Sequence, residues 1–205
     1  MKFFIRPMAK DERFCYTFGM KKWDRVQRSA LGAHGIITSA QAKAMGVLPT
    51  EMYRWSASGR LVKLSRGVFR LAAYPAHGLL SDMAAILASV GEDAYLCGES
   101  ALLLYDLCPV RSYVADVATP HRFRKTAIPK GVRVVKSEPR YAPAYHDGIA
   151  CQRPEDAIRS CIGVLERSRL EEAVDEGGEK GYFLPGEVER LKREIAHGKA
   201  AAQRA

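Results

Sequence analysis

Apolar side chains recur every three or four positions between residues 23 and 33, which is the spacing of one face of an α-helix. They are Trp23, Val26, Ala30 and Leu31. Gly32 and Gly35 follow, where glycine commonly ends a helix. The pattern predicts a first helix over residues 23–33 with one buried face.

Two more helices are expected directly after the first. The hydroxyls at 38–39 are suited to cap a short helix over 40–45, because serine and threonine side chains accept hydrogen bonds from first-turn amides. A third helix is expected over 51–58, where Met52 and Trp55 share an inner face. Proline and threonine before this helix and glycine after it agree with these limits.

Two short runs of alternating apolar and polar residues follow the third helix. Residues 60–64 and 68–71 have the period of two expected for strands, and the connecting 65–67 is typical of a tight turn. Three helices followed by a β-hairpin is the order of a winged helix-turn-helix. In that motif the second helix of the pair enters the DNA major groove, and the wing lies along the backbone or the minor groove.

The rest of the chain mixes helical and strand-like patterns. Helices are expected where apolar residues keep helical spacing, and strands where β-branched residues alternate with others. The expected elements are a helix from Leu79 to Gly91, a helix over 100–107, strands within 112–120 and 131–138, a helical region over 154–176, and a helix over 185–196. Gly177 and Gly178 are expected to break the helical region from the last helix.

These patterns together predict an α+β protein, with an N-terminal winged helix-turn-helix followed by a mixed α/β C-terminal domain. We expect an N-terminal extension over residues 1–20, the winged helix-turn-helix over 21–75, and the C-terminal domain over 76–205. The length of the chain suits one large or two small globular domains.

Charge separates the two predicted domains. The 205-residue chain has a formal net charge of +9. Residues 1–75 contain 14 basic and 4 acidic residues, whereas the remainder contains 18 basic and 19 acidic residues. A basic excess confined to one module is expected of a surface that meets phosphates. A solvated basic face is the alternative that charge alone leaves open.

The helix over 51–58 turns four residues outward if Met52, Trp55 and Leu61 pack inward. These base-facing candidates are Thr50, Tyr53, Arg54 and Ala57. Arg54 leads, because its planar guanidinium can pair with O6 and N7 of guanine. A second set would contact phosphates from the wing and the preceding helix. It comprises Lys43, Lys63, Ser65, Arg66 and Arg70.

Residues 121–140 form a second basic segment, with seven basic residues and one acid. We expect a basic hairpin here that contacts DNA or a protein partner. The candidates are Arg122, Arg124, Lys125, Lys130 and Arg133. The alternative is an edge hairpin whose charges keep it soluble.

The wing resembles the N-terminal transcriptional-regulator domain of AbiEi-type antitoxins. The residues that carry this resemblance are Gly59, Leu61, Gly67, Val68, Phe69, Arg70 and Leu71. A looser resemblance to the C-terminal domain of the same family lies at Ser100, Ala101, Leu102, Leu104, Leu107, Thr119, Pro120, Arg153, Pro154, Glu155, Ala157 and Ile158. The resemblance covers roughly residues 25–195.

The resemblance implies a two-gene toxin–antitoxin pair. The protein would bind double-stranded DNA at repeats in its own promoter as an autorepressor, and would counteract a nucleotidyltransferase-like toxin. One alternative is an antitoxin that modifies its toxin as an atypical kinase or phosphotransferase. Another is a stand-alone winged-helix regulator whose C-terminal domain dimerises or senses a ligand.

The sequence argues against a membrane protein, a metal-binding protein and a secreted protein. No run of about 18 uncharged apolar residues occurs, which excludes a membrane-spanning segment. Charges interrupt the N-terminus within its first turns, which argues against a signal peptide and predicts a cytoplasmic protein. The five cysteines are scattered without a C-x-x-C pair, so we expect no metal. We expect Cys97, Cys108 and Cys161 to be small buried hydrophobes.

Catalytic motifs are absent as well. The sequence contains no phosphate-binding loop, no dinucleotide-binding glycine pattern and no nucleophile elbow. His121, His146 and Asp147 lie in the same half as Ser100 and Cys97, but nothing in their spacing brings them together. We therefore assign no cofactor and no catalytic residue.

Overall fold

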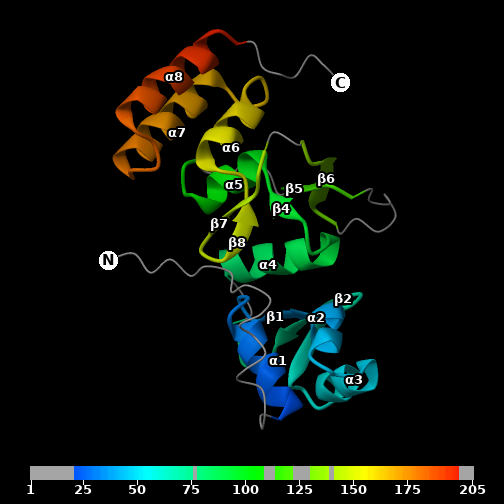
Figure 1. Ribbon diagram of the computed structural model, residues 1–205. Coiled ribbons are helices and arrows are strands. Elements are labelled where there is room, and N and C mark those ends of the chain that lie inside the picture. Colours follow the sequence, from blue (N-terminus) through cyan, green and yellow to red (C-terminus); the bar gives the residue numbers. More distant parts are fainter. Residues whose placement is uncertain (1–20, 76–77, 109–113, 122–129, 139–140, 199–205) are drawn as a thin grey trace. The chain divides into compact units, whose positions relative to one another are not determined.

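The computed structural model describes residues 21–75, 78–108, 114–121, 130–138 and 141–198 (Figure 1). The chain divides into two compact units, Met1–Ser89 and Val90–Ala205. Each unit combines helices with a β-sheet, which confirms the predicted α+β class. A domain limit after residue 75 stays a prediction.

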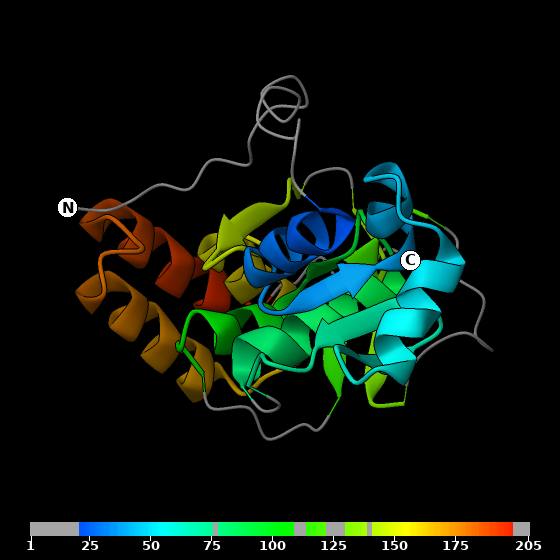
Figure 2. The same ribbon diagram turned by 90° about the horizontal axis from the view of Figure 1, so that it is seen from below.

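The first unit follows the predicted order of a winged helix-turn-helix. Its elements are α1 (Lys22–Leu31), β1 (Ile36–Thr38), α2 (Ser39–Ala44), α3 (Pro49–Ala57), β2 (Leu61–Ser65), β3 (Val68–Leu71) and α4 (Leu79–Val90), of which the last residue belongs to the second unit. The three strands form an antiparallel sheet in the order β1-β3-β2. Helix α3 packs beside β2 (Figure 2).

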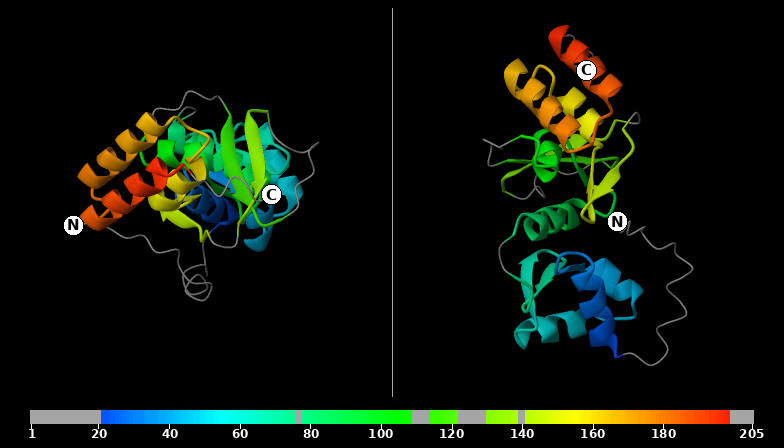
Figure 3. Two further views of the ribbon diagram at one scale, coloured as in Figure 1. Left: turned by 90° about the horizontal axis from the view of Figure 1, so that it is seen from above. Right: turned by 90° about the vertical axis from the view of Figure 1, so that its left-hand side faces the viewer.

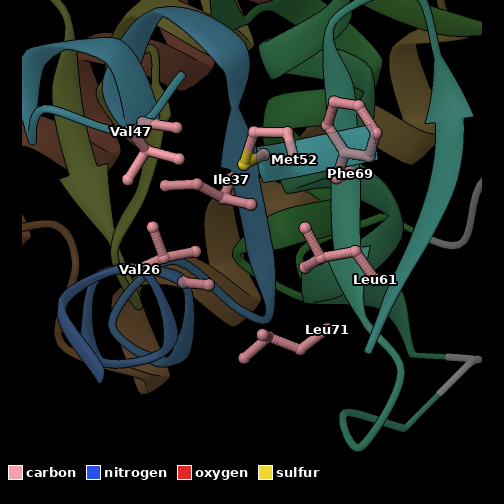
Figure 4. Packing of buried hydrophobic residues seen from close by; sticks show 9 residues of the cluster. Val26, Ile37, Val47, Met52, Leu61, Phe69 and Leu71 are labelled. Carbon is pink, nitrogen blue, oxygen red and sulfur yellow. The ribbon is translucent and has the colours of Figure 1, made fainter. Parts of the chain in front are cut away.

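Eight residues from these helices and strands, together with Val47 from the loop between α2 and α3, form the core of the first unit (Figure 4). They are Val26, Ala30, Ile37, Ala42, Val47, Met52, Leu61, Phe69 and Leu71. Each large side chain of this kind contributes about 1.5–3 kcal/mol when fully buried. The cluster therefore fixes α3 and the wing on one common scaffold.

Local signals explain where α2 and α3 begin. The Thr38 hydroxyl accepts a hydrogen bond from the Gln41 amide at 3.1 Å, and the Gln41 side chain accepts one from the Thr38 amide at 2.9 Å. This reciprocal pair satisfies two amides that would otherwise lack partners at the helix start. Pro49 occupies the first turn of α3, where its missing N–H costs nothing.

Several details of the first unit differ from the prediction, including the start of α3 at Pro49 rather than residue 51. Helix α1 ends at Leu31 rather than residue 33, and the Leu31 side chain is 54% exposed instead of buried. Residues 36–38 form a strand, which the sequence did not indicate because three residues are too few to show a period. Pairing with β3, including Ile37 opposite Phe69, creates this strand.

The second unit holds a five-stranded mixed sheet in the order β6-β5-β4-β8-β7. Its elements are β4 (Tyr95–Leu96), α5 (Gly98–Leu104), β5 (Ala115–Thr119), β6 (Val132–Lys136), β7 (Ala144–His146), β8 (Ile149–Cys151), α6 (Pro154–Cys161), α7 (Arg167–Glu179) and α8 (Pro185–Ala196). Helix α5 packs on β5 and α6, and α7 lies side by side with α8 (Figure 3). The helix expected over 100–107 lies at 98–104.

The predicted basic hairpin is wrong. Strands β5 and β6 exist, but they pair in parallel, with Asp116 opposite Arg133. Parallel neighbours need a crossover connection and cannot be joined by a hairpin turn. Residues 122–129 of the connection lie outside the described residues.

The helical region expected over 154–176 is two helices, because α6 ends at Cys161 and α7 begins at Arg167. The expected break at Gly177 is also wrong, since that residue lies inside α7. A Cβ at Gly177 would come within 2.3 Å of the Phe183 ring. The glycine therefore makes room for a tertiary contact and does not end the helix.

Strands β7 and β8 form an antiparallel hairpin that the sequence pattern does not predict. Asp147 and Gly148 connect them with φ angles of 46° and 79°. Asp-Gly is the favoured dipeptide for such two-residue turns. This dipeptide was the available signal, but the flanking strands have only three residues each.

Candidate nucleic-acid interface

Helix α3 presents the outward face that the sequence predicts. Met52 is 1% exposed and points into the core, whereas Thr50, Tyr53, Arg54 and Ala57 are all exposed. Trp55 is partly buried against the same core. The orientation of the helix is confirmed, and contact of these four residues with DNA stays a prediction.

A bidentate ion pair ties the start of α3 to α1. Lys22 Nζ donates to both carboxylate oxygens of Glu51, at 2.8 and 3.1 Å. Glu51 Oε2 also accepts a hydrogen bond from the Leu48 amide at 2.8 Å. The Leu48 hydrogen bond and the Lys22 ammonium hold the pKa of the Glu51 carboxyl below its ordinary value.

Aromatic contacts hold the other end of α3. The Trp23 and Trp55 rings meet edge to face with centroids 5.1 Å apart. The Arg60 guanidinium lies 5.2 Å from the centroid of the Trp23 ring. Sequence reasoning missed both Lys22 and Arg60, because their partners lie far away along the chain and leave no local pattern.

The wing touches α3 through one exposed residue pair. Lys63 Nζ on β2 lies 5.7 Å from the centroid of the Tyr53 ring. The same ring meets Phe69 of β3 edge to face, with centroids 6.4 Å apart. Such cation–π contacts at exposed sites contribute about 0.5–1 kcal/mol. Tyr53 and Lys63, predicted as separate DNA contacts, therefore form one connected group.

The turn of the wing is anchored on α2. The Ser39 amide donates to the Gly67 carbonyl at 2.8 Å, and Gly67 has a φ of 78°, which favours glycine. Ser65 is half-buried beside a β-bulge, whereas Arg66 is exposed at the turn. Lys43 is exposed on α2. The hydrogen bond to α2 thus holds the turn that carries the exposed Arg66.

Arg70 differs from the other members of the predicted wing set. It lies on β3, the central strand of the sheet, opposite Ile36 and Val62. The residue is half-buried, and its Nε atom is buried. A central strand has neighbours on both sides, so its side chains are more enclosed than those of an edge strand. Arg70 is thus more enclosed than the exposed members of this set, and its contact with phosphate stays a prediction.

The basic segment of the second unit is only partly described. Arg122, Arg124 and Lys125 lie outside the described residues, and Lys130 is exposed. Arg133 Nε and Nη2 donate to the two carboxylate oxygens of Asp116 at 2.6 and 2.7 Å. These hydrogen bonds raise the pKa of the Arg133 guanidinium. Arg133 therefore already has a strong partner within its own sheet.

Among the groups considered for catalysis, His146 and Asp147 lie near each other, with His146 Nε2 3.8 Å from Asp147 Oδ2, whereas His121 and Ser100 have other partners. His121 Nε2 lies 2.9 Å from Asp93 Oδ2, and the Ser100 hydroxyl accepts a hydrogen bond from the Asp116 amide at 2.7 Å. The His146 ring contacts the Tyr105 ring at a tilt of 49°, with centroids 4.5 Å apart. The structure does not bring these residues together as a triad.

The predicted role of the cysteines as small hydrophobes is confirmed for Cys97, Cys108 and Cys161, which are at most 6% exposed. Burial raises the pKa of the Cys97 and Cys161 thiols to about 12. Such thiols are almost wholly protonated at neutral pH and react slowly.

Within the described part of the chain, no helix is long and apolar enough to cross a membrane. Among those same residues, no group of three or more His, Cys, Asp or Glu side chains is placed to hold a metal ion.

Comparison with known proteins finds one family. Residues 24–72 match the family model described as "Transcriptional regulator, AbiEi antitoxin". None of the curated proteins matches the chain. The crystal structure of the RV2827C protein from Mycobacterium tuberculosis is similar at a TM-score of 0.41 and 12% identity, over 85% of this chain and 82% of that chain. The family resemblance is thus confirmed for the segment from α1 to the end of the wing.

Proposed function

We propose that this protein, whose residues 24–72 carry a domain of the AbiEi antitoxin transcriptional-regulator family, binds double-stranded DNA and represses transcription. In this proposal α3 enters the major groove, and the β2–β3 wing lies on the backbone. The observation that carries the proposal is the face of α3, where Thr50, Tyr53, Arg54 and Ala57 are exposed together. The N-terminal basic excess would add a sequence-independent attraction to phosphates.

Different residues have different tasks in this arrangement. Arg54 would read a guanine through two parallel hydrogen bonds, a contact worth about 1–3 kcal/mol of discrimination between bases. Arg66 and Lys63 would contact phosphates, which position the protein but carry no direct sequence information. Lys43 would anchor α2 to the backbone in the same way.

A binding titration with the DNA directly upstream of the gene tests this proposal. We expect Arg54→Ala combined with Arg66→Ala to weaken binding at least about tenfold, because a base contact and a phosphate contact are both lost. Arg54→Ala alone should relax base preference, whereas Lys63→Ala should weaken binding to all sequences alike. Arg28→Ala is the matched control, since it removes an exposed cation from α1. Unchanged binding by the double variant would refute the assignment.

We further propose that the protein acts in the cytoplasm as the antitoxin of a pair with a nucleotidyltransferase-like toxin encoded beside it. The family description supports an antitoxin role. Expression of the neighbouring gene should stop growth, and co-expression of this chain should restore it. If this chain does not relieve the growth arrest, the antitoxin role is refuted and a stand-alone regulator is favoured. A phosphate added to the toxin during incubation with ATP would instead favour the enzymatic alternative.

A further inference from the structure

The exposed face of α3 carries hydrogen-bond donors and methyl groups in a narrow stripe. Thr50, Arg54 and Ala57 are exposed and lie within about 60° of one another around the helix axis, at 100° per residue. They span about 10.5 Å along the helix at 1.5 Å per residue. This length corresponds to about three base-pair steps of 3.4 Å. The stripe therefore matches a site of three to four base pairs.

The one carboxylate on α3 is kept away from this stripe. Glu51 is the sole acidic residue in the sequence of α3, PTEMYRWSA. Its Oε2 atom accepts hydrogen bonds from the Leu48 amide and the Lys22 ammonium, each at 2.8 Å. Its Oε1 atom accepts a hydrogen bond from Lys22 at 3.1 Å. The side chain is 24% exposed. Both oxygens are thus engaged within the protein, and the carboxylate charge is balanced.

These two features have a direct consequence for base recognition. Glutamate is the side chain that accepts a hydrogen bond from the N4 amino group of cytosine, whereas arginine donates to the acceptors of guanine. The methyl groups of threonine and alanine contact the methyl group of thymine. A face with Arg54 at its centre, methyl groups on either side and its carboxylate sequestered favours guanine and thymine.

We propose that α3 reads a guanine flanked on both sides by thymine-bearing base pairs, and that Lys22 is the positioning residue that keeps Glu51 from contacting cytosine. The guanine lies opposite Arg54. The flanking thymine methyl groups contact Thr50 on one side and Ala57 on the other. This inference rests on the proposed function, because it specifies the DNA that α3 binds.

Selection of the full-length chain against a pool of randomised DNA duplexes tests the proposal. The wild-type chain should enrich a guanine with a thymine-bearing base pair on each side. Replacing that guanine by 7-deazaguanine, which lacks N7, should weaken binding about tenfold. Replacing the flanking thymines by uracil, which lacks the methyl group, should weaken it severalfold. These two measurements need no protein variant and so do not depend on the folding of one.

Variants of the ion pair test the role of Lys22. Lys22→Met should free Glu51 Oε1, while Oε2 keeps its hydrogen bond from the Leu48 amide, and should raise the selection of cytosine next to the guanine about tenfold. Lys22→Arg should keep the wild-type preference, and Lys22→Met combined with Glu51→Gln should restore it. Lys21→Met is the matched control, because it removes an exposed neighbouring ammonium that belongs to no ion pair in the described residues. A purely structural role for Lys22 would lower the melting temperature without changing the selected bases.

The outcomes separate this inference from the proposed function. Specific binding to a site without the guanine or the flanking thymines would overturn the inference and leave the proposed function standing. A cytosine preference that Lys22→Met and Lys21→Met change equally would overturn the role of Lys22. Absence of binding to any duplex would overturn both the inference and the proposed function.

Discussion

Arg133 and Asp116 show how a residue that looks like a surface contact can belong to the scaffold. The Asp116 side chain is only 9% exposed, and the Arg133 side chain is 59% exposed. Two parallel hydrogen bonds join them across neighbouring strands. A buried carboxylate needs such partners, because leaving it without them costs the full desolvation penalty.

We expect Arg133→Ala to destabilise the protein by about 1–3 kcal/mol, because it leaves the Asp116 carboxylate buried without this partner. Chemical denaturation measures the change. Lys130→Ala, which removes an exposed cation near the same strand, should stay within about 0.5 kcal/mol of the wild type. Adding Asp116→Asn to Arg133→Ala should recover part of the loss. Equal stability of Arg133→Ala and Lys130→Ala would show that the pair is not structural.

Among the elements, α2 depends on its cap more than on its length. It has six residues, and helices this short are unstable in isolation. The reciprocal bonds between Thr38 and Gln41 fix its first turn, and Ser39 binds the wing through Gly67. The position of α2 relative to the wing is therefore set by a few hydrogen bonds at one helix end.

We expect Thr38→Val to destabilise the protein by about 1 kcal/mol, because valine keeps the β-branched shape needed in β1 but cannot cap α2. Thr38→Ser should retain most of the stability, since serine caps equally well. The midpoint of a urea titration at constant m-value measures both variants. If the valine variant unfolds at the wild-type midpoint, the capping box contributes nothing to the fold.

Three acidic residues of α7 are paired with basic residues close by. Glu171, Asp175 and Glu176 form part of a dense acidic stretch in the sequence. In the structure they pair with Arg167 at 2.7 Å, Lys192 at 2.5 Å and Lys180 at 2.8 Å, respectively. These three charges are balanced by basic residues of α7, α8 and the turn between them, so they stabilise the helix pair.

For the whole molecule, the uneven distribution of charge predicts which residues make DNA binding sensitive to salt. The logarithm of the DNA affinity should fall linearly with the logarithm of salt concentration, by about 0.9 for each phosphate contact. Arg66→Ala should make this slope shallower by about one, because one contact is lost. Lys130→Ala should leave the slope unchanged if the second unit does not touch DNA. An equal change for both variants would place phosphate contacts on the second unit as well.

Most of the first unit was predictable because its signals are local. Helical spacing, capping residues and a glycine turn each act within a few positions, and all of them agreed with the winged helix-turn-helix. The outward face of α3 followed from the period of the helix once Met52 was placed inside. The second unit was less predictable, since its strands have two to five residues and show little periodicity.

The sequence by itself determined the order of the three helices and the β2–β3 hairpin in the first unit, the face of α3 and the basic character of this module, because each depends on neighbouring residues or on composition. Tertiary structure alone decided the parallel pairing of β5 with β6, the ion pair of Lys22 with Glu51, and the enclosure of Arg70. It also decided that Gly177 accommodates Phe183 within a helix. These features join residues distant in the chain, and such contacts form only when packing of the core brings distant segments together.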